Sequence, residues 1–209
     1  GSLRILPPGT EPEKHDHFDL EFARVCLRLR DPRRFGAVLW TRGDPAAHKL
    51  LKHLGPEPLS PEFNGEHLHR LAQKRRAPVK SFIMDGRVVV GAGNIYANEA
   101  LFMSGIHPRR PCNRVSLERY QALAGHIKQV LRAAIKQGGT TLRDFQQGDG
   151  QPGYFAQQLQ VYGKTGEPCP SCGAAIEFKN ARSVAVVCEY CDTTVARTDA
   201  SSALEDVGK

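Results

Sequence analysis

Four cysteines near the end of the sequence form two pairs, and this arrangement constrains the fold more than any other feature. Two residues separate Cys169 from Cys172, and two separate Cys188 from Cys191. Fifteen residues lie between the pairs. This spacing favours zinc over disulfide bonds in a reducing cell. Four thiolates form a closed tetrahedron around Zn(II), so the sequence predicts one structural zinc ion, rather than a catalytic one, holding a small hairpin.

The charge of the chain is uneven along its length. The formal net charge is +7, and residues 169–209 contain four Lys or Arg against six Asp or Glu, which leaves +9 for residues 1–168. A basic excess is typical of chains that bind a polyanion, nucleic acid before membranes, although a generally basic surface is the alternative. Any contacts with nucleic acid are therefore expected mostly before Cys169.

Length and hydropathy set further limits. With 209 residues, 40% of them hydrophobic, the chain can form one or two domains with buried cores. It contains no apolar run of about 18 residues and does not open with a signal-peptide pattern. We therefore expect a cytoplasmic protein.

Residues 17–40 alternate apolar and polar positions, which predicts β-strands. The apolar positions fall in three short runs, over residues 18–22, 25–29 and 38–40. Asp31 and Pro32 interrupt the pattern with turn residues, so the two arginines that follow are expected on a loop.

After Trp40 the apolar period becomes helical. Helices are predicted over residues 46–54, over about 64–76, from residue 94 onward and over 116–136. The last is the clearest, because Ser116 supplies an N-cap, eight apolar positions share one face and Gly138 follows the end. Short β-strands are predicted over 175–178 and 184–187, and no regular structure over 199–209.

Two segments suggest contacts with phosphates. Gly91-Ala92-Gly93 leads into a helix whose first N–H groups can bind an anion, although such a turn is more often required only for packing. Arg28, Arg30, Arg33 and Arg34 surround Phe35, which suits phosphate contact and insertion of the ring into a base stack. The alternative for the second segment is a solvated basic strand edge with Phe35 in the core.

Eight segments together resemble the Fpg/Nei family of DNA glycosylases, and its formamidopyrimidine branch in particular. They follow the family's order and spacing and are residues 15–17 (HDH), 31–36 (DPRRFG), 54–59 (LGPEPL), 91–99 (GAGNIYANE), 138–145 (GGTTLRDF), 152–155 (PGYF), 161–163 (VYG) and 166–169 (GEPC). The resemblance implies an α+β fold. Its expected parts are the end of a β-sandwich (1–45), a helical helix-two-turn-helix domain (46–165), a zinc finger or ribbon (166–192) and a disordered tail (193–209).

The resemblance also implies a function, base-excision repair by a monomer that binds damaged duplex DNA. Members of the family remove oxidised purines such as 8-oxoguanine and formamidopyrimidines, and then cleave the abasic strand. Motif matches imply DNA contacts by His15, Arg33, Arg34, Phe35, Arg75, Lys80, Asn94, Tyr96, Tyr154 and Arg182. Arg33 and Phe35 would fill the gap left by an everted nucleotide, Asn94 would bind a phosphate, and residues 145–157 would close over the base.

The sequence departs from the family pattern in two places. No residue matches the family's N-terminal proline nucleophile or its neighbouring glutamate, so we expect no catalytic residue here, a longer natural protein and an inactive isolated chain. Lys14, Lys80 and Lys128 are the candidate substitutes, but nothing in the sequence indicates the desolvation or neighbouring cation that activates a lysine. Arg182 is one place away from the family's finger arginine.

Two other functions stay open at this point. One is a non-catalytic module that binds damaged DNA. The other is recruitment of a protein by the ribbon and its acidic tail, because the sequence beyond residue 173 is more similar to a different zinc-ribbon family. The absent strands would also leave the apolar face of residues 1–40 unpaired.

Overall fold

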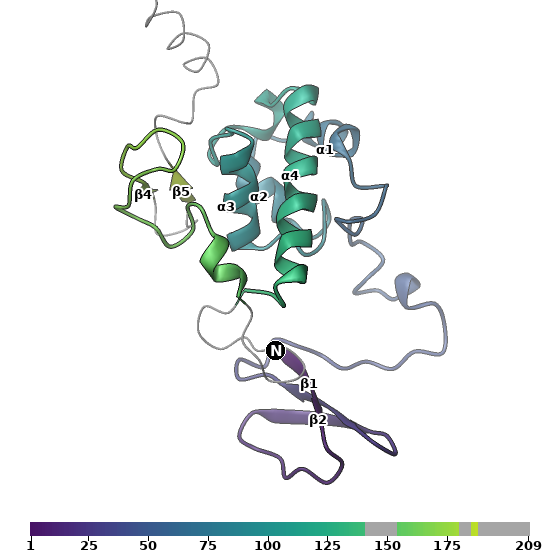
Figure 1. Ribbon diagram of the computed structural model, residues 1–209. Helices are drawn as coiled ribbons and strands as arrows, with labels where there is room; N and C mark the ends of the chain where they lie inside the picture. The colour runs from purple at the N-terminus through teal and green to yellow at the C-terminus, as the bar shows by residue number, and fades with distance from the viewer. Residues whose placement is uncertain (141–153, 180–184, 188–209) are drawn as a thin grey trace, which may run out of the picture. The chain divides into compact units, whose positions relative to one another are not determined.

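The computed structural model describes residues 1–140, 154–179 and 185–187, and these form an α+β structure (Figure 1). The chain divides into two compact units. The first comprises Gly1–Lys52 and Ala133–Gln158, and the second comprises His53–Arg132 and Leu159–Lys209. No helix among the described residues is long and apolar enough to cross a membrane.

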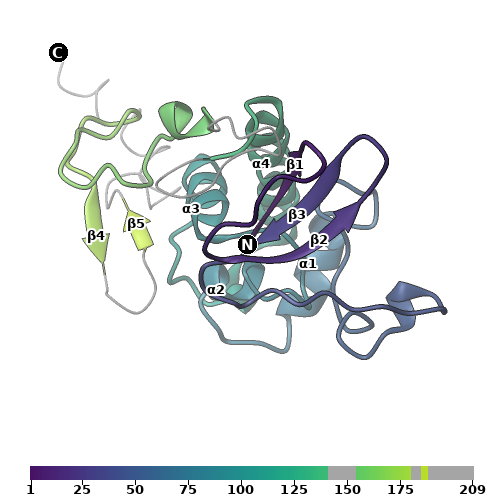
Figure 2. The ribbon, with the colours of Figure 1, turned by 90° about the horizontal axis from the view of Figure 1, so that it is seen from below.

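The first unit is built on a three-stranded antiparallel sheet (Figure 2). Its strands are β1 (Ser2–Leu6), β2 (Asp16–Glu21) and β3 (Cys26–Arg30), in the order β1-β3-β2. The predicted strands over 18–22 and 25–29 are thus confirmed as β2 and β3, whereas β1 was not predicted.

One face of this sheet is apolar, as the alternation in the sequence requires. The register places Leu3 and Phe18 opposite Leu29, and Ile5 and Leu20 opposite Leu27. Because side chains alternate between the faces of a sheet, these six residues share one face. The outer-strand members Leu3, Ile5 and Leu20 are 55%, 58% and 45% exposed.

Arg28 projects from β3 and is buried, which corrects the expectation that it takes part in an exposed arginine cluster. It is only 3% exposed, and its Nε and Nη2 both donate to the Asp19 carboxylate at 2.8 Å. Its guanidinium also donates to the carbonyls of Thr10 (2.7 Å) and Glu11 (3.0 Å), in the loop between β1 and β2. Hydrogen bonding to Arg28 lowers the pKa of Asp19. Arg28 therefore serves the fold.

The strand predicted over residues 38–40 is wrong. The backbone there is in no sheet, and Trp40 is 90% exposed. The segment is apolar, with Val38, Leu39 and Trp40 in succession, but within the described residues no neighbouring strand pairs with it. A strand requires such a partner for its backbone N–H and C=O groups.

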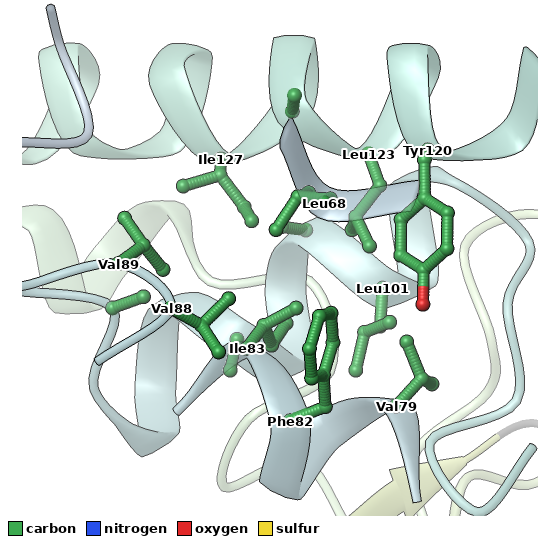
Figure 3. Close-up of a cluster of buried hydrophobic side chains, with 14 of the residues drawn as sticks. Leu68, Val79, Phe82, Ile83, Val88, Val89, Leu101, Tyr120, Leu123 and Ile127 are labelled. Atoms are coloured by element: carbon green, nitrogen blue, oxygen red, sulfur yellow. The ribbon is translucent and has the colours of Figure 1, made fainter. Parts of the chain in front are cut away.

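The second unit contains most of the buried core (Figure 3). Its helices are α1 (Gly65–Ala72), α2 (Val79–Ile83), α3 (Asn94–Met103) and the greater part of α4 (Leu117–Lys136). The core residues labelled in the close-up come from these helices and from the turn before α3, and they are Leu68, Val79, Phe82, Ile83, Val88, Val89, Leu101, Tyr120, Leu123 and Ile127.

The prediction of α4 is confirmed in its bounds and its face. Ser116 Oγ accepts the Arg119 N–H at 3.4 Å, and Gly138 follows the helix with φ +70°. Of the eight apolar positions, all but Leu117 are buried. The strong period, a polar cap and a terminal glycine therefore identified this helix from the sequence.

The helix predicted over residues 46–54 is wrong. Only a 3-10 turn, η1 (Pro45–Ala47), forms there, and Asp44 caps it by accepting the Ala46 N–H at 2.9 Å. The leucines of the expected apolar face, Leu50, Leu51 and Leu54, are 59%, 44% and 49% exposed. A short helix is marginal in water unless its apolar face packs, and this face does not.

The remaining elements are short. The 3-10 helix η2 (Cys112–Arg114) precedes α4. A second one, η3 (Phe155–Gln158), follows Tyr154. Strands β4 (Glu177–Lys179) and β5 (Ala185–Val187) pair antiparallel, with Glu177 opposite Val187. The two short strands predicted between the cysteine pairs are therefore present. The helix predicted over about 64–76 is α1, which ends earlier, at Ala72.

At Gly65, α1 lies against the backbone of α4, and this contact yields a prediction. A Cβ at Gly65 would lie 2.5 Å from the Gln121 nitrogen, whereas a Cβ at Gly125, in α4, meets nothing within 4 Å. We predict that Gly65→Ala lowers the free energy of unfolding by about 1–3 kcal/mol, because backbone must move. Gly125→Ala should raise it by up to about 1 kcal/mol through helix propensity. Urea unfolding measures both, and equal effects of the two variants would contradict the close contact.

Candidate nucleic-acid interface

Residues 31–36, here called the Arg33–Phe35 loop, follow β3 and are held by Asp31. The Gly36 N–H donates to Asp31 Oδ2 at 2.6 Å, and the Arg34 N–H donates to the Asp31 carbonyl at 3.1 Å. Asp31 is 3% exposed, and the Gly36 N–H lowers the pKa of its carboxyl. Hydrogen bonds to Asp31, whose carboxylate is buried, therefore hold the two ends of the loop together.

The tip of this loop presents an aromatic ring to solvent. Phe35 is 81% exposed, and the guanidinium carbon of Arg33 lies 5.2 Å from the centre of its ring. The alternative of Phe35 in the core is therefore wrong. A ring that carries a cation on one face and is otherwise open can stack against a base while the cation meets a phosphate.

His15 lies beside the same loop, within the first unit. It adopts φ +79°, and its carbonyl accepts the Asp31 N–H at 2.9 Å. The neighbouring His17 contributes a second contact, because its Nε2 lies 3.0 Å from the Asp31 carbonyl oxygen. The structure thus places His15 beside the loop that carries Arg33, Arg34 and Phe35.

In the second unit, the start of α3 can accept an anion. Gly91 adopts φ +74°, and Gly93 is the N-cap, with no side chain capping the first turn. A Cβ at Gly93 would meet no atom within 4 Å, so the space beside this turn is open. The first N–H groups of a helix lack intrahelical partners and attract negative charge. Asn94, half-buried, is the first residue of this helix.

Two other predicted contacts are engaged within the second unit. Tyr96 is partly buried and packs against the main core. Arg75 lies with Nη1 3.3 Å from Asp85 Oδ2, and its guanidinium carbon is 5.6 Å from the centre of the Phe82 ring. Arg75 remains partly exposed, so a phosphate would compete with Asp85 for it.

Lys80 is buried, which the sequence did not indicate. It is 2% exposed, its amine has no hydrogen-bond partner among the described residues, and burial lowers its pKa to about 8. The desolvation that lowers the pKa of a lysine is therefore present at Lys80, although no sequence pattern indicated it. A nucleophile must also be reached by its substrate, and the slight exposure of Lys80 does not provide that access.

Part of the predicted site lies outside the described residues. These are Arg182 and residues 145–153 of the expected closing loop. Tyr154 is described and 51% exposed, and its N–H donates to the Gln137 carbonyl at 3.0 Å.

The first cysteine pair forms a tight turn. The Ser171 N–H donates to Cys169 Sγ at 3.4 Å, and the Gly173 N–H donates to the Cys169 carbonyl at 2.8 Å. Cys169 is 3% exposed, whereas Cys172 is open. Cys188 and Cys191 lie outside the described part of the chain, within which no three or more His, Cys, Asp or Glu side chains gather as metal ligands.

Glu99 is an important residue that sequence reasoning missed. It is 2% exposed, and its Oε1 accepts the N–H groups of Val161 (3.0 Å) and Tyr162 (2.9 Å). Its Oε2 accepts the N–H of Gln160 at 2.8 Å. The carboxylate thus joins α3 to the segment that leads to Cys169. One charged residue in an otherwise uncharged helix was the available signal.

Comparison with known proteins identifies the family. The chain is 61% identical over 177 residues to the formamidopyrimidine-DNA glycosylase of Methylococcus capsulatus, covering 84% of this chain and 65% of the relative. It is 56% identical over 194 residues to that of Psychromonas ingrahamii, covering 92% and 72%. The chain belongs to the formamidopyrimidine-DNA glycosylase family. It spans about two thirds of the length of these relatives.

The domain and the fold agree with this assignment. Residues 54–146 match the formamidopyrimidine-DNA glycosylase H2TH domain. The MutM (Fpg) protein from Thermus thermophilus has a TM-score of 0.79 at 36% identity, covering 90% of this chain and 71% of that one. A complex between Lactococcus lactis Fpg and DNA with an abasic site has a TM-score of 0.80 at 32% identity, covering 92% and 71%.

The Glu99 contacts predict a specific instability. In Glu99→Gln an NH₂ group replaces one carboxylate oxygen and faces a backbone N–H, so we expect the free energy of unfolding to fall by about 2–4 kcal/mol. Hydrogen exchange at residues 160–162 should also become faster. Glu118→Gln, at an exposed position in the first turn of α4, is the control and should change stability by less than about 0.5 kcal/mol. Slow exchange at 160–162 in Glu99→Gln would show that the carboxylate does not hold this segment.

Proposed function

We propose that this chain is the DNA-binding part of a monomeric base-excision repair glycosylase. The enzyme would remove oxidised purines, namely 8-oxoguanine and formamidopyrimidines, from duplex DNA and then cleave the abasic strand. The observation that carries the proposal is the exposed Phe35 ring, with Arg33 against it, on a loop fixed by a buried carboxylate. Structures of Lactococcus lactis relatives hold DNA that contains Fapy-dG or an abasic site, and these support the substrate class.

The geometry suits a duplex from which one nucleotide is everted. Eversion costs a few kcal/mol of stacking and pairing, so a side chain must replace the lost base. Phe35 has the exposed ring for this role, and Arg33 carries charge to the same point. Asn94 and the uncapped first turn of α3 suit a backbone phosphate. Arg34, within the Arg33–Phe35 loop, and His15, beside it, would extend these contacts.

The remaining predicted contacts have less direct support. Tyr154 is half-exposed and directly follows the expected closing loop, so it stays a candidate. Arg75 can contribute through its exposed part. Tyr96 packs against the core and Lys80 is almost fully buried, so neither side chain is open to a phosphate in the way that Arg75 is.

The domain assignment follows the same proposal. Residues 1–45 would be the end of the family's β-sandwich, 46–165 its helix-two-turn-helix domain, 166–192 its zinc finger and 193–209 a tail. The three-stranded sheet within residues 1–30 and the helices between 65 and 136 are consistent with the first two parts.

We propose that Cys169, Cys172, Cys188 and Cys191 bind one structural zinc ion. The turn at Cys169 supports this, because an N–H donated to a cysteine sulfur stabilises a thiolate ligand. Zinc would hold the β4–β5 hairpin, which has little apolar surface to bury, and would take no part in the reaction.

Membership of a glycosylase family favours the enzyme over a non-catalytic module that binds damaged DNA. The relatives are glycosylases by name, and the similarity extends over 84–92% of this chain. Both functions share the same DNA-binding surface, so binding is the first property to test.

Binding to a duplex with a tetrahydrofuran abasic-site analogue tests the proposal. We expect fluorescence anisotropy to give about tenfold tighter binding than to undamaged duplex, with affinity falling steeply as salt rises. Phe35→Ala should remove most of this preference, because the gap is no longer filled. Phe22→Ala, which removes an exposed ring outside the loop, should retain it. Absence of binding to either duplex at low ionic strength would overturn the proposed function.

A further inference from the structure

We propose that Asp31 is a positioning residue for damage recognition, whose buried carboxylate fixes the Arg33–Phe35 loop so that Phe35 is presented to the base stack. This inference rests on the proposed function and adds a residue to it. Asp31 itself would touch no DNA. It acts through Phe35.

The contacts of Asp31 converge from two sides. On the loop side, its Oδ2 accepts the Gly36 N–H at 2.6 Å and its carbonyl accepts the Arg34 N–H at 3.1 Å. On the sheet side, its N–H donates to the His15 carbonyl at 2.9 Å, and His17 Nε2 lies 3.0 Å from its carbonyl oxygen. Asp31 therefore joins the loop to the turn before β2.

Asp31 restrains the loop through the backbone of the loop. The Arg34 and Gly36 N–H groups both donate to Asp31, and no backbone hydrogen bond of residues 32–36 to another residue is found within the described part of the chain. Arg34 also adopts φ +54°, a left-handed conformation that a residue with a Cβ keeps only when its surroundings impose it. Without the carboxylate, the loop would lose the contact that closes it.

The carboxylate is suited to this task by its burial and charge. Asp31 is 3% exposed, so water competes little for its oxygens, and hydrogen bonds to an ionised acceptor are stronger than neutral ones. The space is also tight, because a Cβ at Gly36 would lie 3.0 Å from Asp31 Oδ2. A methyl group at residue 36 would therefore crowd Asp31 Oδ2 and disturb its hydrogen bond with the residue 36 N–H.

A double-mutant cycle tests the proposal with the full 209-residue chain. The variants are Asp31→Ala, Phe35→Ala and the double variant, bound to undamaged duplex and to tetrahydrofuran duplex with 2-aminopurine next to the gap. Asp31→Ala should reduce the preference for the gapped duplex about fivefold to tenfold and weaken the 2-aminopurine signal. In the Phe35→Ala background, Asp31→Ala should have no further effect. Asp31→Asn, which keeps an oxygen for the Gly36 N–H, should restore most of the preference.

Two controls separate positioning from general stability. Asp44→Ala removes another aspartate that caps a backbone N–H in the same unit, and it should leave preference and signal unchanged. Gly36→Ala keeps the carboxylate but crowds it, and it should reproduce the loss seen in Asp31→Ala. If Asp31→Ala lowers the melting temperature strongly, the binding preference of Gly36→Ala shows whether the loop is positioned by its contact with Asp31.

The outcomes are distinguishable from failure of the proposed function. If the unsubstituted chain binds neither duplex, the proposed function fails. If it prefers the gapped duplex but Asp31→Ala and Gly36→Ala keep that preference, the positioning role is overturned. It is also overturned if Asp31→Ala weakens binding equally with and without Phe35, because Asp31 would then not act through the ring.

Discussion

Two buried carboxylates, Asp31 and Glu99, organise the parts of this chain that matter for function. Asp31 is 3% exposed and its carboxylate accepts the Gly36 N–H, whereas Glu99 is 2% exposed and its carboxylate accepts three backbone N–H groups. In both cases the donors lie in a segment without regular structure. Burying a charge is costly unless hydrogen bonds compensate it, so each carboxylate and its segment stabilise one another. One holds the loop that presents Phe35, and the other joins α3 to the chain that leads to the first cysteine pair.

The structure also separates residues that can meet a ligand from residues that serve the fold. Phe35 and the first turn of α3 are open, and neither is occupied by another part of the described chain. Arg28, by contrast, is paired with Asp19 beneath a loop, and Lys80 is enclosed. The basic charge of the chain is therefore a poor guide to which residues are open to a ligand, because Arg28 is engaged in an internal ion pair.

Local sequence patterns predicted the elements that find a partner. Helix α4 buries its apolar face, and strands β2 and β3 pair through their backbones although the apolar side chains of the outer strands stay exposed. Residues 46–54 form no α-helix because their leucines do not pack, and residues 38–40 form no strand because no described strand pairs with them. The resemblance was sufficient to predict the family and the Arg33–Phe35 loop. The contacts of Glu99 join residues up to 63 positions apart, so no local pattern could predict them.

If the proposed function holds, the Arg33–Phe35 loop and the first turn of α3 both contact damaged duplex DNA. Hydrogen exchange of the chain, with and without a duplex containing an abasic-site analogue, examines both segments in one experiment. We expect slower exchange at residues 33–36 and 94–96 in the complex, because both segments become shielded from water. A complex that forms while exchange in both segments stays unchanged would show that neither segment contacts the duplex.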